Sequence, residues 1–463
     1  MPITADEGAY PRRPDAPSAP DRMAAIATLF GLTPADPATA HVLDAACGDG
    51  ANLLPWAVRY PRARFVGCER SATLLARARE AAAELGLANV ELIEGDVRHA
   101  ALPEGAFDCV VAHGIGSTMA PAERDALFAL AHQRLAPQGV VLTSYRVLPG
   151  GYLHRIGADA VRLETSGVAS ERERRDGAVR VRDDLASAWR TAGGMAAALA
   201  VGLAEDDEAD ATARAADPGE QAGEAVYFTT FVRQASRHGL GFLAEADLGT
   251  MGASGLPPAF QRLIASSDPI AREQYLDFAR VRAIRRSLLV RAEALRHARL
   301  SPQAIDALHA TAPAGIEDGS ARDALVARTL TENRPGSVPV PELRSVLEAN
   351  GVRSEEARAR VVRAAFGGEL VLHATPVTAA ARAGARPRAF AFARWQAARG
   401  GALINLLHEP VRIDEPEARA LLARLDGTRD RSALAASLEP HPDARAFVER
   451  ALDECARKGL LEA

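Results

Sequence analysis

The chain has 463 residues, enough for two or three domains that each bury a core of their own. Hydrophobic residues make up 48% and charged residues 25%, an ordinary globular composition, and the net charge of -5 gives no electrostatic basis for a nucleic-acid partner. No apolar run reaches the roughly 18 residues of a membrane span, and residues 1–10 lack a basic-then-apolar signal pattern, so we expect a cytoplasmic protein.

The first 150 residues alternate strand and helix signals. Short apolar runs predict five strands, at residues 41–46, 63–68, 90–93, 107–112 and 140–145. Helical patterns lie before and between them, at residues 21–30, 51–60, 71–85 and 121–135. Asp21 and Ser71 are the expected N-caps, and Gly31 and Gly86 end their helices. Strands that alternate with single helices predict an α/β fold, a parallel sheet with helices on both faces.

The pattern changes after Gly151. Residues 155–203 read as helices rich in alanine and charge, and residues 205–224 are acidic, small and polar, which is typical of a mobile loop. Two helix–strand pairs follow, with helices expected at 227–238 and 269–282 and strands at 239–243 and 287–290. We expect these strands to complete the first sheet, so that the residues before them form a helical insertion.

The remainder of the chain is predicted to be mainly helical. Pro- and Gly-rich breaks at 333–341 and 383–387 divide the helices after Ser301, and the apolar segment 370–373 is a candidate strand of a winged-helix unit. The four cysteines lack metal-ligand spacing, so we expect buried thiols and no metal site. Lys458 is the single lysine, so an individual arginine in this chain carries little functional information.

The strongest local signal is the glycine-rich turn after the first predicted strand, Val42-Leu43-Asp44-Ala45-Ala46-Cys47-Gly48-Asp49-Gly50. Glycines at a strand end let the backbone approach a ligand, and the next helix presents free N–H groups there. Leu53 stands where a dinucleotide fingerprint has its third glycine, and no Lys-Ser/Thr pair makes a phosphate-binding loop. The alternative is an ordinary tight turn.

Acidic residues at the strand ends favour a ligand-binding turn over an ordinary tight turn. Asp44 and Asp49 would repel a pyrophosphate and suit a ligand that carries an ammonium and a sulfonium. Glu69 ends the second strand, where an acid accepts hydrogen bonds from both ribose hydroxyls. Asp96 follows the third strand, where a carboxylate can accept from the adenine amino group, with Val97 beside the ring. Four acids at one sheet edge predict an S-adenosylmethionine site.

A histidine closes the fourth strand, beside the expected methyl donor. His113 either orients the acceptor or takes its proton, or it is a turn residue that only hydrogen-bonds backbone. Tyr145 is the second candidate for a catalytic proton acceptor, whereas Arg146 and Tyr152 either face the acceptor or are structural. Trp56 and Tyr10 either cover the cofactor or pack. The predicted cofactor-binding set is Tyr10, Asp44, Ala46, Gly48, Gly50, Glu69, Arg70, Asp96, Val97 and His113.

With these motifs, the first 150 residues resemble class I S-adenosylmethionine-dependent methyltransferases. A later region resembles the methyltransferase regulatory domain, which is found in bacterial protein lysine methyltransferases of the rickettsial outer-membrane-protein-modifying kind. The motifs that carry this resemblance are Tyr227-Phe228-Thr229-Thr230-Phe231-Val232, Ser236-Arg237-His238-Gly239-Leu240, Phe242-Leu243-Ala244-Glu245-Ala246-Asp247-Leu248, Ser254-Gly255-Leu256-Pro257 and Ala271-Arg272-Glu273-Gln274-Tyr275-Leu276-Asp277-Phe278. Other segments also resemble that group of methyltransferases: Asp21-Arg22-Met23-Ala24-Ala25-Ile26, His113-Gly114, Leu148-Pro149-Gly150 and, more loosely, Leu425-Asp426-Gly427-Thr428.

The sequence departs from that family at the acceptor side. Gly116 and Thr118 stand where the family tends to have Tyr and Trp, and Arg146 and Gly151 stand where it tends to have Asn and Trp. Aromatic walls are a natural way to hold an alkyl-ammonium chain. Cofactor binding is therefore expected to be kept, whereas the acceptor is left open.

The resemblance implies methyl transfer to a nitrogen or oxygen acceptor on a protein or peptide, of the lysine type. It divides the chain into a cofactor-binding core (1–150), a helical insertion with an acidic loop (151–224), a regulatory-domain-like region that completes the sheet (225–300) and a helical, winged-helix-like C-terminal domain (301–463). Two alternatives stay open: a small-molecule methyltransferase of a biosynthetic pathway, and a non-catalytic S-adenosylmethionine-binding interaction protein.

Overall fold

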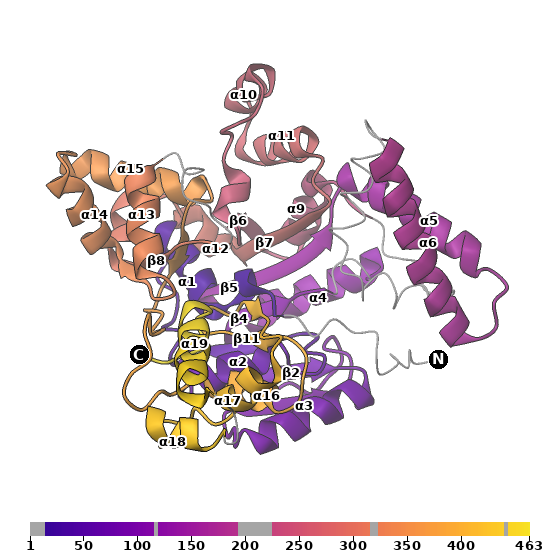
Figure 1. The fold of residues 1–463 in the computed structure, drawn as a ribbon. Coiled ribbons are helices and arrows are strands. Elements are labelled where there is room, and N and C mark those ends of the chain that lie inside the picture. The colour runs from indigo at the N-terminus through magenta and orange to yellow at the C-terminus, as the bar shows by residue number, and fades with distance from the viewer. Residues whose placement is uncertain (1–13, 115–118, 193–224, 315–322, 439–442) are drawn as a thin grey trace.

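A seven-stranded sheet forms the centre of the molecule, in the spatial order β3-β2-β1-β4-β5-β7-β6 (Figure 1). The computed structural model describes residues 14–114, 119–192, 225–314, 323–438 and 443–463. The strands are β1 His41–Asp44, β2 Arg64–Glu69, β3 Val90–Glu94, β4 Phe107–Ala112, β5 Leu135–Arg146, β6 Leu240–Glu245 and β7 Ile284–Arg291. Strands β1 to β5 pair in parallel, and β7 runs antiparallel to both of its neighbours. The predicted α/β fold is confirmed, and the region after the insertion supplies β6 and β7.

Helices cover both faces of this sheet, so the central strands β1 and β4 are almost entirely buried. The helices from this part of the chain are α1 Pro20–Leu29, α2 Leu53–Arg59, α3 Ala72–Glu84, α4 Pro121–Arg134, α9 Phe228–Arg237, α10 Pro258–Ala265, α11 Pro269–Arg280 and α12 Ala292–His297, with short 3-10 turns η1 Ala16–Ser18 and η2 Leu248–Met251. One hydrophobic cluster joins α1, α2 and α12 to one face, and another joins α4 and α9 to the other.

The two predicted N-caps have different outcomes. The Ser71 hydroxyl accepts a hydrogen bond from the Leu74 N–H at 3.3 Å and caps α3, as predicted. Asp21 is not a cap, because α1 begins with Pro20 after an Ala19 N-cap. Its buried carboxylate instead bonds His373 at 2.9 Å, a residue of the C-terminal part of the chain. The prediction was wrong because a partner distant in sequence takes this carboxylate.

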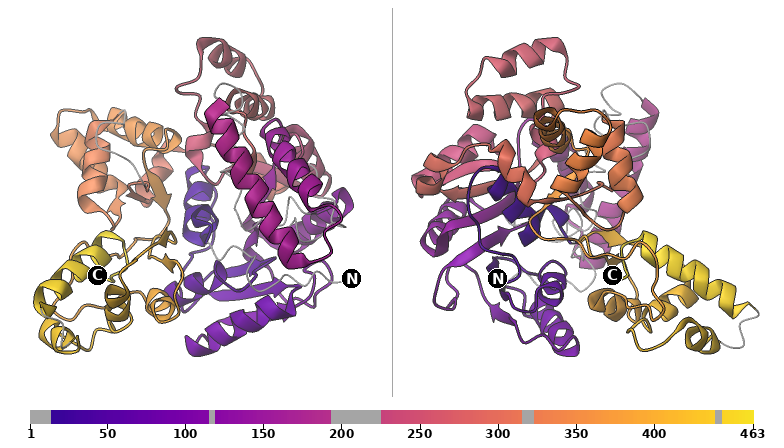
Figure 2. Two further views of the ribbon diagram at one scale, coloured as in Figure 1. Left: turned by 45° about the vertical axis from the view of Figure 1, so that its right-hand side comes forward. Right: turned by 90° about the vertical axis from the view of Figure 1, so that its left-hand side faces the viewer.

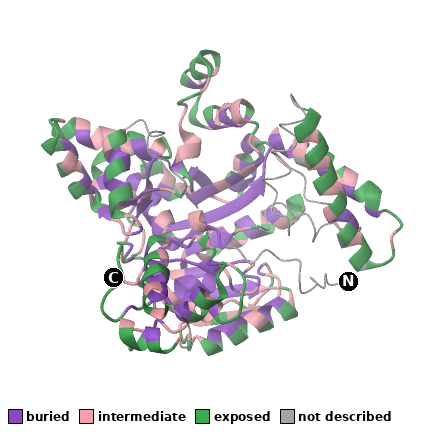
Figure 3. Ribbon diagram, in the orientation of Figure 1, coloured by how far each residue is buried: buried purple, intermediate pink, exposed green. Residues whose placement is uncertain are grey.

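The insertion after the fifth strand is a helical hairpin, α5 Gly150–Thr165 and α6 Glu171–Ala192. Figures 1 and 2 show the two helices side by side, apart from the C-terminal helices. Much of their surface is exposed, in contrast to the buried strands of the sheet (Figure 3). The loop expected at 205–224 lies outside the described residues.

The C-terminal part contains two units with different cores. The first has η3 Pro302–Ala307, β8 His309–Thr311, α13 Ala324–Asn333, β9 Val338–Pro339, α14 Val340–Ala349, α15 Ser354–Phe366 and β10 Val371–His373. Its apolar residues continue the cluster around α1, and β10 occupies the segment predicted as a strand. The second has α16 Ala391–Ala397, β11 Leu403–Ile404, β12 Pro410–Val411, α17 Pro416–Leu422, α18 Arg431–Ala436 and α19 Ala444–Arg457. It has a separate cluster, which also contacts Leu54 of α2 and Ala81 of α3.

A buried ionic network joins β6, β7 and α11. The Arg285 guanidinium, which is fully buried, contacts Glu245 at 2.6 Å, Asp277 at 2.9 Å and Glu273 at 3.2 Å. It also lies over the Phe228 ring, 3.9 Å from its centroid. Burial raises the pKa of Glu273 to about 7, while the charge of Arg285 opposes this effect. The acids of the regulatory-domain motifs therefore have a structural role here.

Among the described residues, no helix combines the length and apolar character needed to cross a bilayer. All four cysteines, Cys47, Cys68, Cys109 and Cys455, are buried free thiols, as the sequence predicted.

Candidate cofactor and methyl-transfer site

The predicted site residues lie at one edge of the sheet, where the parallel strands β1 to β4 end. Asp44 and Glu69 are the last residues of β1 and β2, Asp96 lies two residues beyond β3, and His113 directly follows β4. The pairing of β1 with both β2 and β4 sets these ends side by side. A ligand in an open α/β sheet binds at this edge.

The glycine turn after β1 can be made only with little side-chain bulk. Gly48 and Gly50 have φ angles of 56° and 82°, a left-handed conformation that favours glycine. A Cβ at Gly50 would lie 2.7 Å from the Leu54 side chain. Glu69 ties this turn to the next strand, because its carboxylate accepts from the Gly48 N–H at 3.0 Å and the Ser71 N–H at 2.8 Å. The turn is therefore held open beside the end of β2.

Asp44 is the most unusual carboxyl group of this edge. It is 2% exposed, and within the described part of the chain its Oδ2 has no hydrogen-bond partner. Burial raises its pKa to about 7, and the Glu69 charge adds to this, while hydrogen bonds from the Ala46 N–H and the Asn52 side chain oppose it. An orphaned buried carboxylate oxygen fits a cationic ligand, which would satisfy it and favour its ionised form. The glycine cradle and this oxygen together fit S-adenosylmethionine.

Asp96 is held by a residue that the sequence did not single out. Arg98 donates to it from its backbone N–H at 3.0 Å, from Nε at 2.8 Å and through Nη2. These bonds lower the pKa of Asp96 to about 2, with a smaller effect from Arg70 at 3.7 Å, so the carboxylate is ionised at neutral pH. Val97 is buried behind it. In a chain with so many arginines, no sequence signal distinguishes Arg98.

His113 has a buried carboxylate beside it. Its Nδ1 lies 3.5 Å from Oδ2 of Asp15, whose other oxygen accepts from Arg286 Nε at 2.6 Å. Burial raises the pKa of Asp15, but the charges of His113 and Arg286 outweigh this and hold it below its ordinary value. Asp15 was missed because it precedes the first predicted helix by several residues and belongs to no motif.

Tyr145 is a correction to the predicted catalytic pair. Strand alternation turns it to the opposite face of the sheet from Ser144, whose hydroxyl accepts from the Gly114 N–H at 2.8 Å. The Tyr145 ring is 1% exposed and stacks on Phe231 at 3.7 Å, and its hydroxyl bonds Ser287 at 3.1 Å. Burial raises the pKa of this phenol well above its ordinary value. It is therefore not placed to take a proton from an acceptor.

The other candidates divide between packing and surface positions. Trp56 is buried and packs against His408 in a tilted arrangement, 5.0 Å between ring centroids, which supports its packing interpretation. Arg146 is buried and Tyr152 is about half exposed. Tyr10, like Gly116 and Thr118, lies outside the described residues.

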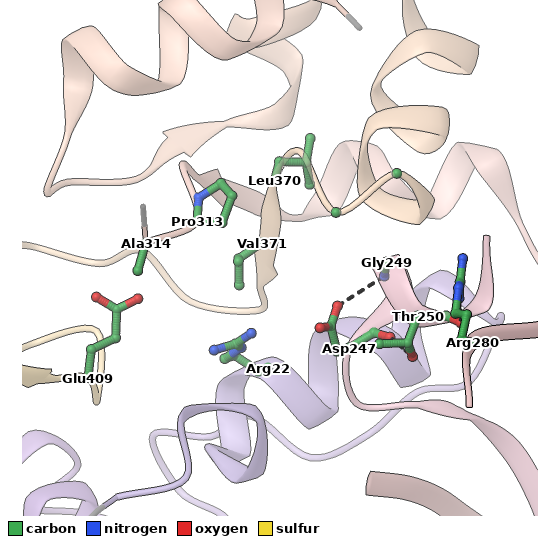
Figure 4. A pocket seen from close by; sticks show the side chains of 12 residues that line it. Arg22, Asp247, Gly249, Thr250, Arg280, Pro313, Ala314, Leu370, Val371 and Glu409 are labelled. Carbon is green, nitrogen blue, oxygen red and sulfur yellow. Dashed lines mark hydrogen bonds between the residues drawn. The ribbon is translucent and has the colours of Figure 1, made fainter. Parts of the chain in front are cut away.

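A cavity of about 510 Å³ is lined by residues of α1, η2 and α11 and of the loops around Pro313, Gly368 and Glu409 (Figure 4). Figure 4 shows Arg22 pointing into it between Glu409 and Asp247. None of the predicted cofactor residues that the structure describes lines this cavity, so it is distinct from the predicted site.

Three segments of the chain match known domain families. Residues 42–139 match a methyltransferase domain, residues 220–291 a predicted methyltransferase regulatory domain, and residues 385–447 the PKMT C-terminal winged helix domain. The seven-stranded sheet and the matched segments are those of a methyltransferase domain, followed by a regulatory-domain segment and a winged-helix segment.

Over its whole length, the chain is similar in fold to PKMT2 from Rickettsia typhi. The TM-score is 0.81 at 20% identity, and the match covers 98% of this chain and 100% of that one. A second structure of that protein, in complex with AdoHcy, gives the same TM-score at 21% identity and covers 98% and 99%.

Two curated relatives from Rickettsia prowazekii match parts of the chain. Uncharacterized protein RP789 is 28% identical over 296 residues, 61% of this chain and 52% of that protein. Uncharacterized protein RP028 is 32% identical over 148 residues, 32% of this chain and 59% of that protein. The chain therefore spans just over half the length of these relatives.

Proposed function

We propose that the chain transfers a methyl group to a nitrogen or oxygen atom of a protein or peptide acceptor, with a lysine amine as the favoured acceptor. The observation that carries the proposal is the orphaned Asp44 carboxylate oxygen at a glycine turn, one strand from His113. When bound, S-adenosylmethionine supplies a methyl group that its sulfonium has already activated. The remaining work of the chain is positioning, exclusion of water and proton removal.

The residues of the sheet edge have separate roles in this proposal. Gly48 and Gly50 admit the cofactor to the backbone, Asp44 faces its cationic end, and Glu69 accepts from the ribose. Asp96 and Val97 bind the adenine. Ala46 and Arg70 border the site, and Tyr10, outside the described residues, remains a predicted member of the cofactor-binding set.

His113 takes the proton that an amine must lose before its lone pair can attack. This role is supported by the position of the ring, directly after β4 and one third exposed. Neutral imidazole accepts a proton well near neutral pH.

A protein or peptide acceptor is supported by the match to the PKMT C-terminal winged helix domain and by the shared fold with PKMT2. We propose that the four parts of the chain have different functions. These parts are a core (1–150), an insertion (151–224), a sheet-completing region (225–300) and a C-terminal part (301–463). The insertion and the C-terminal part would then shape the acceptor site. We also propose that the protein acts in the cytoplasm and has no nucleic-acid partner. Fractionation of source cells tests the location.

The test is incubation of the purified chain with isotope-labelled methyl donor and a lysate of the source organism. Label in macromolecules at lysine side chains is the expected result. Label only in extractable metabolites would show a small-molecule methyltransferase. Tight cofactor binding without any transfer would favour a non-catalytic binding protein.

A further inference from the structure

Two buried polar atoms face each other at the end of β4. They are Oδ2 of Asp15 and Nδ1 of His113, 3.5 Å apart, and within the described residues neither has a hydrogen-bond partner. Asp15 is 6% exposed, so water does not replace the missing partner freely. A closure of a few tenths of an ångström makes a normal hydrogen bond between them.

This pairing fixes which nitrogen of His113 is free. An Nδ1–H that donates to Asp15 leaves the lone pair on Nε2, where a proton from an acceptor is taken up. Nδ1 is buried while the side chain is 33% exposed, so the exposed surface of His113 belongs to side-chain atoms other than Nδ1. The orientation suits a base that works toward an open site.

Asp15 is connected by hydrogen bonds, through Asn52, to His408 in the C-terminal part of the chain. Its backbone N–H donates to Asn52 Oδ1 at 3.0 Å, and the same oxygen accepts from His408 Nε2 at 2.8 Å. The amide of Asn52 donates to Ser18 at 3.0 Å, whose hydroxyl donates to the Asp15 carbonyl at 2.7 Å. Burial lowers the pKa of His408 to about 3, so it is neutral and donates through Nε2.

His408 belongs to the unit with the winged-helix match and is placed by its own fold. It has a φ of 61°, a left-handed conformation that is uncommon outside glycine, and its ring packs against Trp56 of α2. The surrounding structure must impose this conformation. A chain of contacts thus runs from the C-terminal unit through Asn52 and Asp15 to His113.

We infer that Asp15 is the positioning residue of His113, and that the C-terminal unit holds Asp15 in place through His408 and Asn52. The inference rests on the proposed function only in the use made of His113; the pairing itself is independent of it. Arg286 of β7 and Arg22 of α1 are the other charged groups that face Asp15. They keep the carboxylate ionised, so that it stabilises an imidazolium when His113 takes up a proton.

The first experiment compares Asp15→Asn and Asp15→Ala with the unaltered chain. We expect kcat to fall at least about tenfold in Asp15→Ala and less in Asp15→Asn, whose amide oxygen can still accept from Nδ1–H. KM for the cofactor and the affinity for AdoHcy should stay within about twofold. Unchanged kcat in both variants would overturn the inference.

The second experiment distinguishes the specific contacts from His408 through Asn52 to Asp15 from a general effect of how the C-terminal part packs on the rest of the chain. His408→Ala removes the contact to Asn52, and His373→Ala is the matched control, a buried histidine that bonds Asp21 of α1 at 2.9 Å but has no contact with Asp15. We expect His408→Ala to lower kcat several-fold and His373→Ala to leave it unchanged, with thermal unfolding used to confirm that both are folded. Equal losses in both variants would contradict the inference.

A third readout does not depend on methyl transfer. Nitrogen NMR of histidine-labelled protein, with His113→Gln to assign the signal, should show the Nδ1–H tautomer in the unaltered chain and its loss in Asp15→Ala. If the chain transfers no methyl group but the tautomer behaves in this way, the proposed function fails and the pairing stands. The Nε2–H tautomer in the unaltered chain would refute the pairing.

Discussion

Cofactor affinity should depend on pH through Asp44. In the ligand-free chain this carboxyl is buried with a pKa of about 7, so below that pH it is mostly protonated. The ammonium group of S-adenosylmethionine or AdoHcy favours the ionised form, so protein that binds at low pH must first release this proton. The affinity for the cofactor should therefore increase as the pH rises through about 7. The same raised pKa destabilises the ligand-free fold as the pH increases from about 4 to about 7.

The magnitude follows from the fraction of ionised Asp44. With a pKa of about 7, about one tenth of the free protein is ionised at pH ~6 and about nine tenths at pH ~8. If the bound carboxyl is ionised throughout, the affinity for AdoHcy should increase about tenfold over this interval, or ~1.4 kcal/mol. At pH ~7, binding should release about half a proton.

Titration calorimetry in buffers of different ionisation enthalpy measures both the affinity and the released proton. Asp44→Asn keeps the shape of the side chain but cannot titrate, so it should bind more weakly and with little pH dependence. His113→Gln is a second control, since a protonated imidazole would also repel a cation. A tenfold pH dependence that persists in Asp44→Asn would refute the reasoning, as would a flat profile in the unaltered chain.

Three further substitutions have defined outcomes. Glu69→Ala should weaken AdoHcy binding by about 1.5–3 kcal/mol in calorimetry, whereas Glu94→Ala, at the exposed end of the next strand, should not. Gly50→Ala should lower the free energy of unfolding by about 1–3 kcal/mol and weaken AdoHcy binding. Gly86→Ala is the control, because Gly86 has a similar φ but open space around it. This variant should lose only the stability that backbone strain costs, and it should bind AdoHcy normally. Arg285→Met should lower the free energy of unfolding in urea by about 3–5 kcal/mol, because three buried acids lose their counter-charge, and an increase in stability would contradict this.

The parallel sheet and its acidic edge were predictable from local pattern. Apolar runs separated by single helices leave few topologies, and parallel strands gather their carboxyl ends at one edge. Asp44, Glu69 and Asp96 could therefore be placed together without a structure, and Ser71 could be identified as a cap.

The contacts between distant segments were not predictable in this way. Asp15, Asn52 and His408 lie far apart in the sequence, and only the packing of the C-terminal unit against α2 joins them. Asp21 lost its predicted role for the same reason. The error at Tyr145 has another cause. The position of a residue at the end of a strand predicts the edge of the sheet at which it lies, but the pleat of the strand determines the face on which its side chain packs.

A phosphate-free nucleoside that carries an ammonium group should occupy the ends of β1, β2 and β3. A crystal structure of the chain with AdoHcy tests this placement. We expect the ribose hydroxyls within hydrogen-bond distance of Glu69 and the amino group of the ligand near Asp44. Ligand density in the cavity around Arg22 and Asp247, with the strand-end carboxylates free of contact, would contradict it.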